Sequence, residues 1–501
     1  MNKQLRQFVL LAILTGCLYV GLFSHHHSAA KTFAIILYFV VLVSIVFQLL
    51  LENRSPYKTL LWIYVLLFLP VIGYLYFIYS GQLQVKGYLF QRKRENNETY
   101  LRNAFNNKQN PLWENMTGEE QRISNMIVKK SNFPISFFTE TKVLRNGDET
   151  FPAILEALKN ARRYIYLEYY IFRDDDIGTE IVRVLEEKAR QGLDVRLIYD
   201  AVGSVGLSMR TIKKMEAAGV QVACFSPIKS GFFNQKINFR NHRKIIVVDG
   251  KAGFVGGLNI GDEYLGRDKR MGFWRDTHLL VKGEAVRSLH AIFIIDWAYL
   301  SHETVTPEQT ERTFPMGKSD GGVQVAASGP DSNEGLMTNL YFSMITSARQ
   351  SVWIATPYFI PNKAIRSALA MAAARGVSVK LMVPETNDGF LTKYATRSYF
   401  DELLDNGIEV YMYRKGFMHQ KIMIVDGRYA SIGTANVDFR SLNLNFEVNV
   451  FLFNCSSVKE LINNYKTDIA ESVQVDLERY RNRRLTVRAK ESVARLFSPA
   501  L

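Results

Sequence analysis

Cysteine is scarce in this chain of 501 residues, which holds only Cys17, Cys224 and Cys455. Three widely spaced thiols without a pairing pattern argue against a disulfide scaffold and favour a reducing environment. The metal-ligand patterns HExxH and CxxC are also lacking, and the His residues outside one repeated motif are scattered or clustered at residues 25 to 27. We therefore expect neither a metal nor a cofactor.

Acidic residues are few relative to basic ones. Lys and Arg number 62 against 48 Asp and Glu, a net charge of +14, which favours an anionic partner, either a membrane surface or a nucleic acid. Charge is missing altogether from residues 33–51 and 60–79. Each run is long enough to cross roughly 30 Å of hydrocarbon. These runs predict a transmembrane helical hairpin and favour anionic membrane lipids over nucleic acid.

The first 134 residues divide by composition. Residues 1–85 are predicted to be a membrane region, and the shorter apolar run 8–23 within it is left open as a third span, an interfacial anchor or a cleaved signal peptide. Residues 86–134 are a polar connector that begins with Lys86 and the cluster 92–94. Basic flanks mark the cytoplasmic side. We therefore expect a multi-pass protein with its catalytic lobes in the cytoplasm.

A motif of His, Lys and Asp occurs twice with the same internal spacing. The first copy is His242-Arg-Lys244-Ile-Ile-Val-Val-Asp249, and the second is His419-Gln-Lys421-Ile-Met-Ile-Val-Asp426. In each copy Gly follows seven residues after the Asp and Asn follows ten after it, at Asn259 and Asn436. The apolar runs predict strands, on which residues two apart share a face. Each His is therefore expected to point the same way as its Lys.

Two such strands facing each other would suit attack on a phosphate diester. One imidazole can attack phosphorus while the other protonates the leaving oxygen and later deprotonates the acceptor. Lys and Asn can hold the oxygens on which charge develops. Asp249 and Asp426 precede Gly at strand ends, a position that favours structural support over chemistry. Orienting acceptors for the imidazoles are sought in Glu447, 28 residues after His419, and in Asp276, 34 after His242.

The duplication extends beyond the motifs. Helix, strand, helix and strand are predicted at 151–163, 164–172, 177–191 and 195–199, and the same order returns at 336–349, 352–360, 363–375 and 377–383. We expect an α/β fold of two lobes, residues 135–305 with the motif at 237–264 and residues 323–501 with the motif at 414–441. The Pro- and Gly-containing stretch 306–322 is the predicted linker.

The paired motifs resemble the signature of the phospholipase D superfamily, H-x-K-x4-D-x6-G-[GST]-x-N, and match it completely. The stretches 241–250 and 440–447, the apolar hairpin and the C-terminal 495–501 resemble bacterial cardiolipin synthases. The resemblance implies duplicated phospholipase D-like lobes with one pseudo-twofold site and a phosphatidyl-histidine intermediate. It implies the active-site set His242, Lys244, Asp249, His419, Lys421 and Asp426, supported by Asn259, Asn436, Asp276 and Glu447.

The resemblance implies condensation of two phosphatidylglycerol molecules into cardiolipin and glycerol at a bacterial cell membrane. His242 is our choice for the nucleophile and His419 for the acid. A phospholipase D-type hydrolase, a nuclease, a phosphatidylserine synthase and a non-catalytic lipid-binding scaffold are the alternatives. The two spans disfavour the nuclease, and the intact His and Lys pairs disfavour the scaffold. The sequence leaves acceptor specificity and oligomeric state open.

Three further stretches are candidates for contact with lipid. Residues 231–233 place Phe beside a basic loop, residues 288–300 form an apolar run that we interpret as a core helix, and residues 479–495 form a very basic C-terminal helix. Exposed aromatic and cationic side chains together are typical of a bilayer surface, although a charged run is more often simply solvated.

Overall fold

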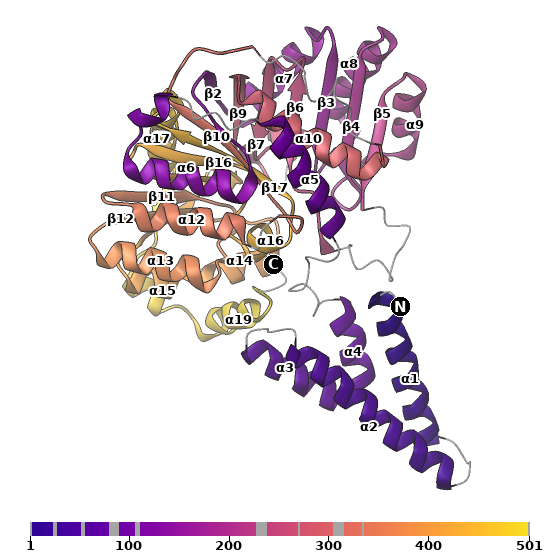
Figure 1. Cartoon of the computed structure of the whole chain (residues 1–501). Helices are drawn as coiled ribbons and strands as arrows, with labels where there is room; N and C mark the ends of the chain where they lie inside the picture. Colours follow the sequence, from indigo (N-terminus) through magenta and orange to yellow (C-terminus); the bar gives the residue numbers. More distant parts are fainter. Residues whose placement is uncertain are drawn as a thin grey trace. The chain divides into compact units, whose positions relative to one another are not determined.

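A computed structural model describes residues 3–23, 28–51, 56–79, 90–105, 111–226, 238–268, 271–303, 315–332 and 335–498. The chain divides into two compact units, one that ends at Gln91 and one that starts at Arg92 (Figure 1). The predicted lipid-contact loop 231–233 lies outside the described residues.

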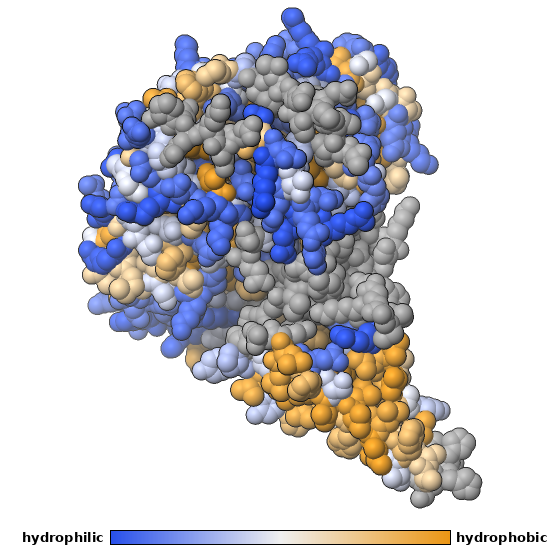
Figure 2. All heavy atoms as spheres, viewed as in Figure 1, coloured by the Kyte–Doolittle hydropathy of each residue, from blue (hydrophilic) through white to orange (hydrophobic). Residues whose placement is uncertain are grey.

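The first unit is a set of four apolar helices, α1 Lys3–Phe23, α2 Ser28–Leu51, α3 Pro56–Phe68 and α4 Pro70–Tyr79. Leu14, Ile45, Leu66 and Ile78 are among the residues that form its small core. Many other large apolar side chains point outward, so that these helices expose a nearly continuous hydrophobic surface (Figure 2). A surface of this kind requires an apolar surrounding, and the region is accordingly a membrane-associated one.

Of the described helices, one is both long and apolar enough to cross a membrane, at Ala29–Leu51, and it contains the first predicted span, 33–51. The second predicted span, 60–79, is divided into α3 and α4 at Leu69. The cause is Pro70, which has no N–H to donate and whose ring crowds the carbonyl four residues earlier. The run 8–23 is part of helix α1, which packs against α2 and α4.

The second unit is built on two large mixed sheets. The first has the strand order β2-β9-β7-β6-β3-β4-β5, and the second has β1-β10-β17-β16-β15-β11-β12-β13-β18. The strands of the first sheet are β2 Thr139–Arg145, β3 Tyr164–Tyr169, β4 Asp194–Asp200, β5 Gln221–Phe225, β6 Lys244–Val248, β7 Ala252–Gly256 and β9 Thr277–Gly283. Those of the second are β1 Ile135–Ser136, β10 Gly322–Ser328, β11 Ser351–Ala355, β12 Ser378–Pro384, β13 Glu409–Tyr413, β15 Ile422–Val425, β16 Tyr429–Gly433, β17 Glu447–Phe453 and β18 Ser472–Gln474.

The two sheets are copies of one plan. Seven strands of each follow the same order. In both copies the strand next to the motif strand, β3 or β11, begins a run of three parallel strands, β3-β4-β5 and β11-β12-β13. The other pairs in the repeated order are antiparallel. The predicted duplicated α/β architecture is confirmed, and strand β1, which lies at the start of the predicted first lobe, pairs with β10 of the second.

Helices cover both sheets. They are α5 Gln91–Ala104, α6 Gly118–Ser131, α7 Asn146–Lys159, α8 Asp176–Arg190, α9 Met209–Ala217, α10 Val286–Ser301, α12 Leu336–Ser347, α13 Lys363–Ala374, α14 Phe390–Arg397, α15 Phe400–Asp405, α16 Phe439–Asn443, α17 Ser456–Ala470, α18 Leu477–Arg481 and α19 Leu485–Leu496. Helix α10 is buried in the core, which confirms the interpretation of residues 288–300. The predicted C-terminal helix 479–495 is instead two helices, α18 and α19.

The two lobes share one hydrophobic core. Apolar residues of β6, β7 and β9 and of β10, β15, β16 and β17 lie in the same buried cluster with α10 and α17. Strands β7 and β9 contact β16 and β17. Because this face is dry and continuous, the two lobes are held as one body, and the first residues of β6 and β15 are brought close together.

The polar connector 86–134 is structured where it is described, over residues 90–105 and 111–134. Lys93 of α5 is buried, with Nζ 2.8 Å from Asp296 of α10, and it also contacts Asp331. Burial opposes the charge on Lys93, but the two carboxylates outweigh it and raise its pKa. The connector is therefore part of the second unit, because its cation neutralises acids that would otherwise be buried without a partner.

Candidate active site

Each repeated motif starts just ahead of a strand. Lys244 is the first residue of β6, and β15 begins one residue after Lys421. His242 and His419 therefore lie before the strands rather than within them, a small difference from the expected single run. In both copies the Lys folds back on its own motif. Nζ of Lys244 donates to the carbonyl of His242 at 2.8 Å, and Nζ of Lys421 donates to that of His419.

Backbone hydrogen bonds between the lobes fix the positions of both histidines. The amide of His242 donates to the carbonyl of Phe446 at 2.9 Å, and the amide of Phe446 donates to Arg240 at 2.9 Å. The second motif is held in the same way, since the amide of His419 donates to the carbonyl of Arg275 at 2.7 Å. Strands β8 Phe273–Arg275 and β14 Gly416–Met418 pair next to this bond. Phe446 and Arg275 directly precede Glu447 and Asp276, so each pairing carries a carboxylate to the histidine of the other lobe.

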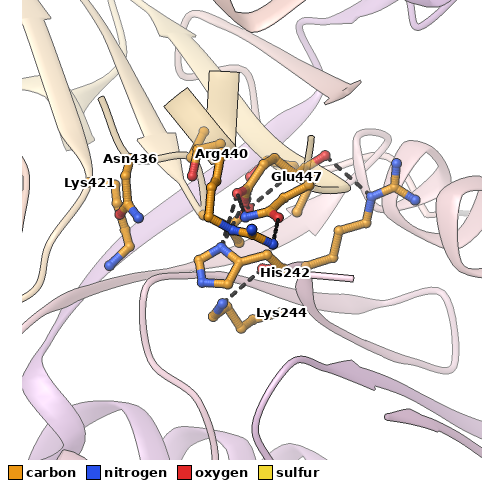
Figure 3. Close-up of polar contacts among 12 residues, drawn as sticks. His242, Lys244, Lys421, Asn436, Arg440 and Glu447 are labelled. Carbon is orange, nitrogen blue, oxygen red and sulfur yellow. Dashed lines mark hydrogen bonds and ion pairs between the residues drawn. The ribbon is translucent and has the colours of Figure 1, made fainter. Parts of the chain in front are cut away.

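The carboxylates are exchanged between the lobes. Nδ1 of His242 lies 2.9 Å from Oε2 of Glu447 (Figure 3), and Nδ1 of His419 lies 2.8 Å from Oδ2 of Asp276. Burial opposes ionisation of both acids, but the neighbouring histidines and lysines hold the pKa of each below its usual value. An ionised carboxylate only accepts hydrogen bonds, so each Nδ1 carries the proton and each Nε2 has a free lone pair.

Burial and positive charge keep both imidazoles neutral. Burial is the largest cause of the lowered pKa of His242, and for His419 burial and the Lys421 ammonium lower the pKa to about 3. The lysines are affected by burial as well, since the pKa of Lys421 falls to about 8 and that of Lys244 lies well below its usual value. Each lysine also acts on the histidine of the other motif. The four groups therefore form one electrostatic cluster, in which Glu447 and Asp276 bind Nδ1 of the two imidazoles.

The two asparagines are each held by hydrogen bonds to nearby residues. Asn259 accepts from the amide of Ile171 at 3.1 Å and donates to the Tyr264 hydroxyl at 2.9 Å. Asn436 donates to Asp438 at 2.8 Å, while its own side-chain oxygen is buried without a hydrogen-bond partner among the described residues. An unsatisfied buried polar atom costs stability, and such atoms collect where a ligand completes the site.

The structure does not bring Asp249 and Asp426 to the histidines. Asp249 lies five residues after Lys244, about 16 Å along the strand. The carboxylate of Asp249 accepts from the amides of residues 162–164 at 2.8 to 3.0 Å, and that of Asp426 accepts from the amides of residues 349–351. Both acids adopt a left-handed backbone, with φ of 55° and 52°. They tie the end of the motif strand to the start of its neighbour.

The residue after the motif glycine differs between the two copies. It is matched to the nearby carboxylate, which is Glu447 in one copy and the shorter Asp276 in the other. Thr434 donates its hydroxyl to Oε2 of Glu447 at 2.5 Å. At the matching position in the first copy is Gly257, where a Cβ would lie 2.0 Å from Oδ1 of Asp276. Asp276 is itself fixed by His419 and by the amide of Thr277. The hydroxyl orients one acid, and the missing side chain leaves room for the other.

Replacing Gly257 by Ala is expected to reduce turnover at least about tenfold, because the new methyl group would displace Asp276 from His419. Thr434→Val is expected to lower turnover by a similar factor through loss of the bond to Glu447, whereas Thr434→Ser keeps the hydroxyl and should keep the rate. Steady-state rates of the purified variants measure both effects. A wild-type rate for Gly257→Ala would contradict the assigned role of Asp276.

Several contributors were not found by sequence reasoning. Tyr170 packs its ring 5.0 Å from that of His242, and Trp274 lies 5.2 Å from His419. Arg243 contacts Asp296 and donates to the backbone carbonyl of Glu447 at 3.3 Å, so that it fixes the chain on both sides of the histidine–acid pair. The only signal was the position of these residues next to motif members, which does not separate them from ordinary core side chains.

Two lobes that each contribute one His and one Lys to a single pseudo-twofold site define the phospholipase D-like class of proteins. A family model described as "Cardiolipin synthase, PLD-like domain" matches residues 154–297 and 341–469, one segment in each lobe. A second, "Phospholipase_D-nuclease N-terminal", matches residues 36–81 in the membrane-associated region.

Similar proteins support the same assignment. The chain is 48% identical to a probable cardiolipin synthase, YwiE, of Bacillus subtilis, and 46% identical to a cardiolipin synthase of Halalkalibacterium halodurans, over the full length of each chain in both cases. In fold it is similar to a phosphatidylserine synthase of Haemophilus influenzae, with a TM-score of 0.57 and 14% identity over 77% of this chain and all of that one. The chain belongs to the cardiolipin synthase family of phospholipase D-like proteins.

Proposed function

We propose that this protein is a membrane-bound phosphatidyltransferase that condenses two phosphatidylglycerol molecules into cardiolipin and glycerol. The observation that carries the proposal is the pair of neutral, carboxylate-bound imidazoles between two buried lysines. Two neutral bases beside two cations are suited to a phosphodiester, and the two carboxylates are already engaged by Nδ1 of the histidines. Family membership and the exposed apolar helices of the first unit favour a lipid phosphodiester.

In the first half-reaction, Nε2 of His242 attacks the phosphorus of one phosphatidylglycerol. The bond from phosphorus to the glycerol headgroup breaks, and His419 gives a proton to the departing oxygen. The two lysines neutralise the non-bridging oxygens as charge develops. The negative substrate offsets the positive field of Lys421, which favours a proton on His419 at this stage.

In the second half-reaction, the terminal hydroxyl of the second phosphatidylglycerol loses its proton to His419 and attacks the phosphorus. The bond between phosphorus and Nε2 of His242 breaks, and cardiolipin is released. Water would give phosphatidic acid instead. Both imidazoles are almost buried, with 12% and 9% of their side chains exposed, and this limited access favours a bound alcohol over bulk water.

The remaining site residues support these groups. We assign Glu447 and Asp276 to orientation of the two imidazoles, Asn436 and Asn259 to the border of the phosphate site, and Asp249 and Asp426 to the framework of the strands. The helices of the first unit are proposed to make the protein multi-pass, with the catalytic unit on the cytoplasmic side next to the basic cluster 92–94.

The decisive experiment offers the purified full-length protein phosphatidylglycerol alone in detergent and separates the products. Cardiolipin and free glycerol in equal amounts are expected. Phosphatidic acid as the sole lipid product would replace the proposal by hydrolysis. Addition of glycerol should reverse the reaction, because the same histidines serve both directions.

The pH dependence of the rate should report the buried lysines. As pH rises through about 8, Lys421 loses its charge, so kcat/KM is expected to fall there. A bound phosphodiester stabilises the ammonium, so the same fall in kcat should occur at higher pH, since kcat/KM reports the free enzyme and kcat the complex. Lys415→Met removes a cation exposed at the surface and should leave both profiles unchanged. Identical falls in kcat and kcat/KM would contradict contact between Lys421 and the substrate.

A further inference from the structure

Helices α14 and α19 lie against each other and expose an unusual number of large apolar side chains. We name this the α14–α19 surface. Leu485 and Leu496 are each 78% exposed and Phe390 is 64% exposed. The exposed set is Phe390, Leu391, Leu485, Val493, Leu496 and Phe497. Scattered exposed apolar residues need no explanation, but a contiguous group on two packed helices indicates a partner.

Helix α19 exposes its large apolar side chains, whereas a helix on the surface of a soluble domain turns such side chains inward. Val493 and Leu496 lie eight and eleven residues after Leu485, a spacing that places all three on one exposed face of the helix. The buried side carries the small Ala494 and Glu491, and Glu491 accepts from the Tyr480 hydroxyl at 2.9 Å and from Arg483 at 2.8 Å. Because the polar anchor holds the helix in place, the apolar face is presented to the outside.

The same surface is strongly basic. Residues 477–498 contain seven Lys or Arg residues and two acids, Glu478 and Glu491. Three of these cations, Arg481, Arg483 and Arg495, pair with carboxylates of α15. Lys490 lies 6.0 Å from the ring centre of Phe390, and Arg484 and Arg488 have no carboxylate partner within the described ranges. Apolar side chains interleaved with free cations are complementary to the headgroup layer of an anionic bilayer rather than to a neutral protein surface.

This surface continues toward the candidate active site. Asp388, two residues before Phe390, accepts a hydrogen bond from the Tyr358 hydroxyl and acts electrostatically on Lys421. A phospholipid that places its phosphate between the lysines still has its acyl chains to accommodate. A bilayer lying on the α14–α19 surface would bring that lipid to the site without removing its chains from hydrocarbon.

We propose that the α14–α19 surface is a membrane-contact surface of the catalytic unit, separate from the N-terminal helices, which rests on the headgroup layer of an anionic bilayer. Its role in bringing substrate to the site rests on the proposed function. Its contact with lipid does not, and the two are tested separately below.

The contact is tested with an environment-sensitive fluorophore on Ala489→Cys, an exposed position on α19, in the full-length protein reconstituted in vesicles. With phosphatidylglycerol vesicles we expect a blue-shifted emission that brominated lipids quench. Both effects should weaken in phosphatidylcholine vesicles and in high salt. Met371→Cys, on α13 and 61% exposed, is the matched control and should remain water-exposed. The wild-type chain labelled in parallel measures the background from its own cysteines.

Two results would overturn the contact. Emission at residue 489 equal to that at residue 371 in every vesicle would leave the surface in water. A blue shift at residue 489 that grows with protein concentration in detergent, without lipid, would assign the surface to a second copy of the chain.

The functional consequence is tested with Leu485→Asp combined with Leu496→Asp. We expect about a tenfold lower rate on phosphatidylglycerol in bilayers and an unchanged rate on a short-chain phosphatidylglycerol dissolved as monomers. Met371→Asp should change neither rate. Equal losses on both substrates would indicate a damaged fold and contradict the delivery role. If the wild type made no cardiolipin, the proposed function would fail while the fluorescence result stood.

Discussion

Alanine in place of His419 is expected to convert the protein into one that reacts once and stops. The substrate is a phosphatidyl ester with a nitrophenol leaving group, which departs without a proton. His419→Ala should release a single equivalent of nitrophenol and retain the phosphatidyl group on His242, because the second step still needs a base. On phosphatidylglycerol the same variant should lose at least about 1,000-fold in kcat, since that leaving group does need the proton.

His242→Ala provides the matched contrast. It should release no nitrophenol in a burst and form no adduct, because the attacking nitrogen is absent. Intact-mass measurement detects the added phosphatidyl group, and absorbance follows the burst. A burst from His242→Ala and none from His419→Ala would exchange the two roles. Bursts from both variants would contradict a histidine nucleophile altogether.

Removal of the charge on each carboxylate is expected to affect the histidine of the opposite lobe. Glu447→Gln should slow the nitrophenol burst about 100-fold, because His242 loses the negatively charged acceptor that sets its tautomer and orientation. Asp276→Asn should leave the burst close to the wild-type rate and lower turnover of phosphatidylglycerol, which depends on His419 as the acid. The two measurements thus separate the two pairs.

Pairing within each lobe would give the reverse outcome, a slow burst in Asp276→Asn and a normal one in Glu447→Gln. Asp405→Asn changes a carboxylate that pairs with Arg481 at the surface and should affect neither measurement. The crossed arrangement is also present in the backbone. The amide of His242 binds Phe446 and that of His419 binds Arg275, and these two partners directly precede Glu447 and Asp276. A fall in both the burst and the turnover in each of the two variants would point to a general loss of folding.

Local patterns in the sequence were sufficient for the elements of each lobe. Helix α13 was expected at 363–375 and lies at Lys363–Ala374, and strand β12 was expected at 377–383 and lies at Ser378–Pro384. The apolar period decides these elements because each helix or strand buries one side against its own sheet. The position before Gly at a strand end favoured a structural role for Asp249 and Asp426, whereas the resemblance placed both in the active-site set. In the structure both carboxylates accept from backbone amides.

The prediction was less complete where distant segments meet. The polar residues 86–134 read as a connector, yet Lys93 is buried between Asp296 and Asp331, more than 200 residues away. A cation gives no sign in the sequence of whether it is solvated or neutralises buried acids. The run 60–79 did contain its own signal, Pro70, and the helix ends there for the local reason that proline lacks an N–H.

The sequence by itself determined that two copies of one motif stand on two copies of one α/β unit, because spacing along a strand and an apolar period are local properties. Only the tertiary structure decided that Glu447 serves His242 and that Asp276 serves His419. The physical reason is that the lobes share one dry core and exchange backbone hydrogen bonds at the site. Which acid reaches which histidine therefore depends on the packing of the lobes, to which distance along the chain gives no guide.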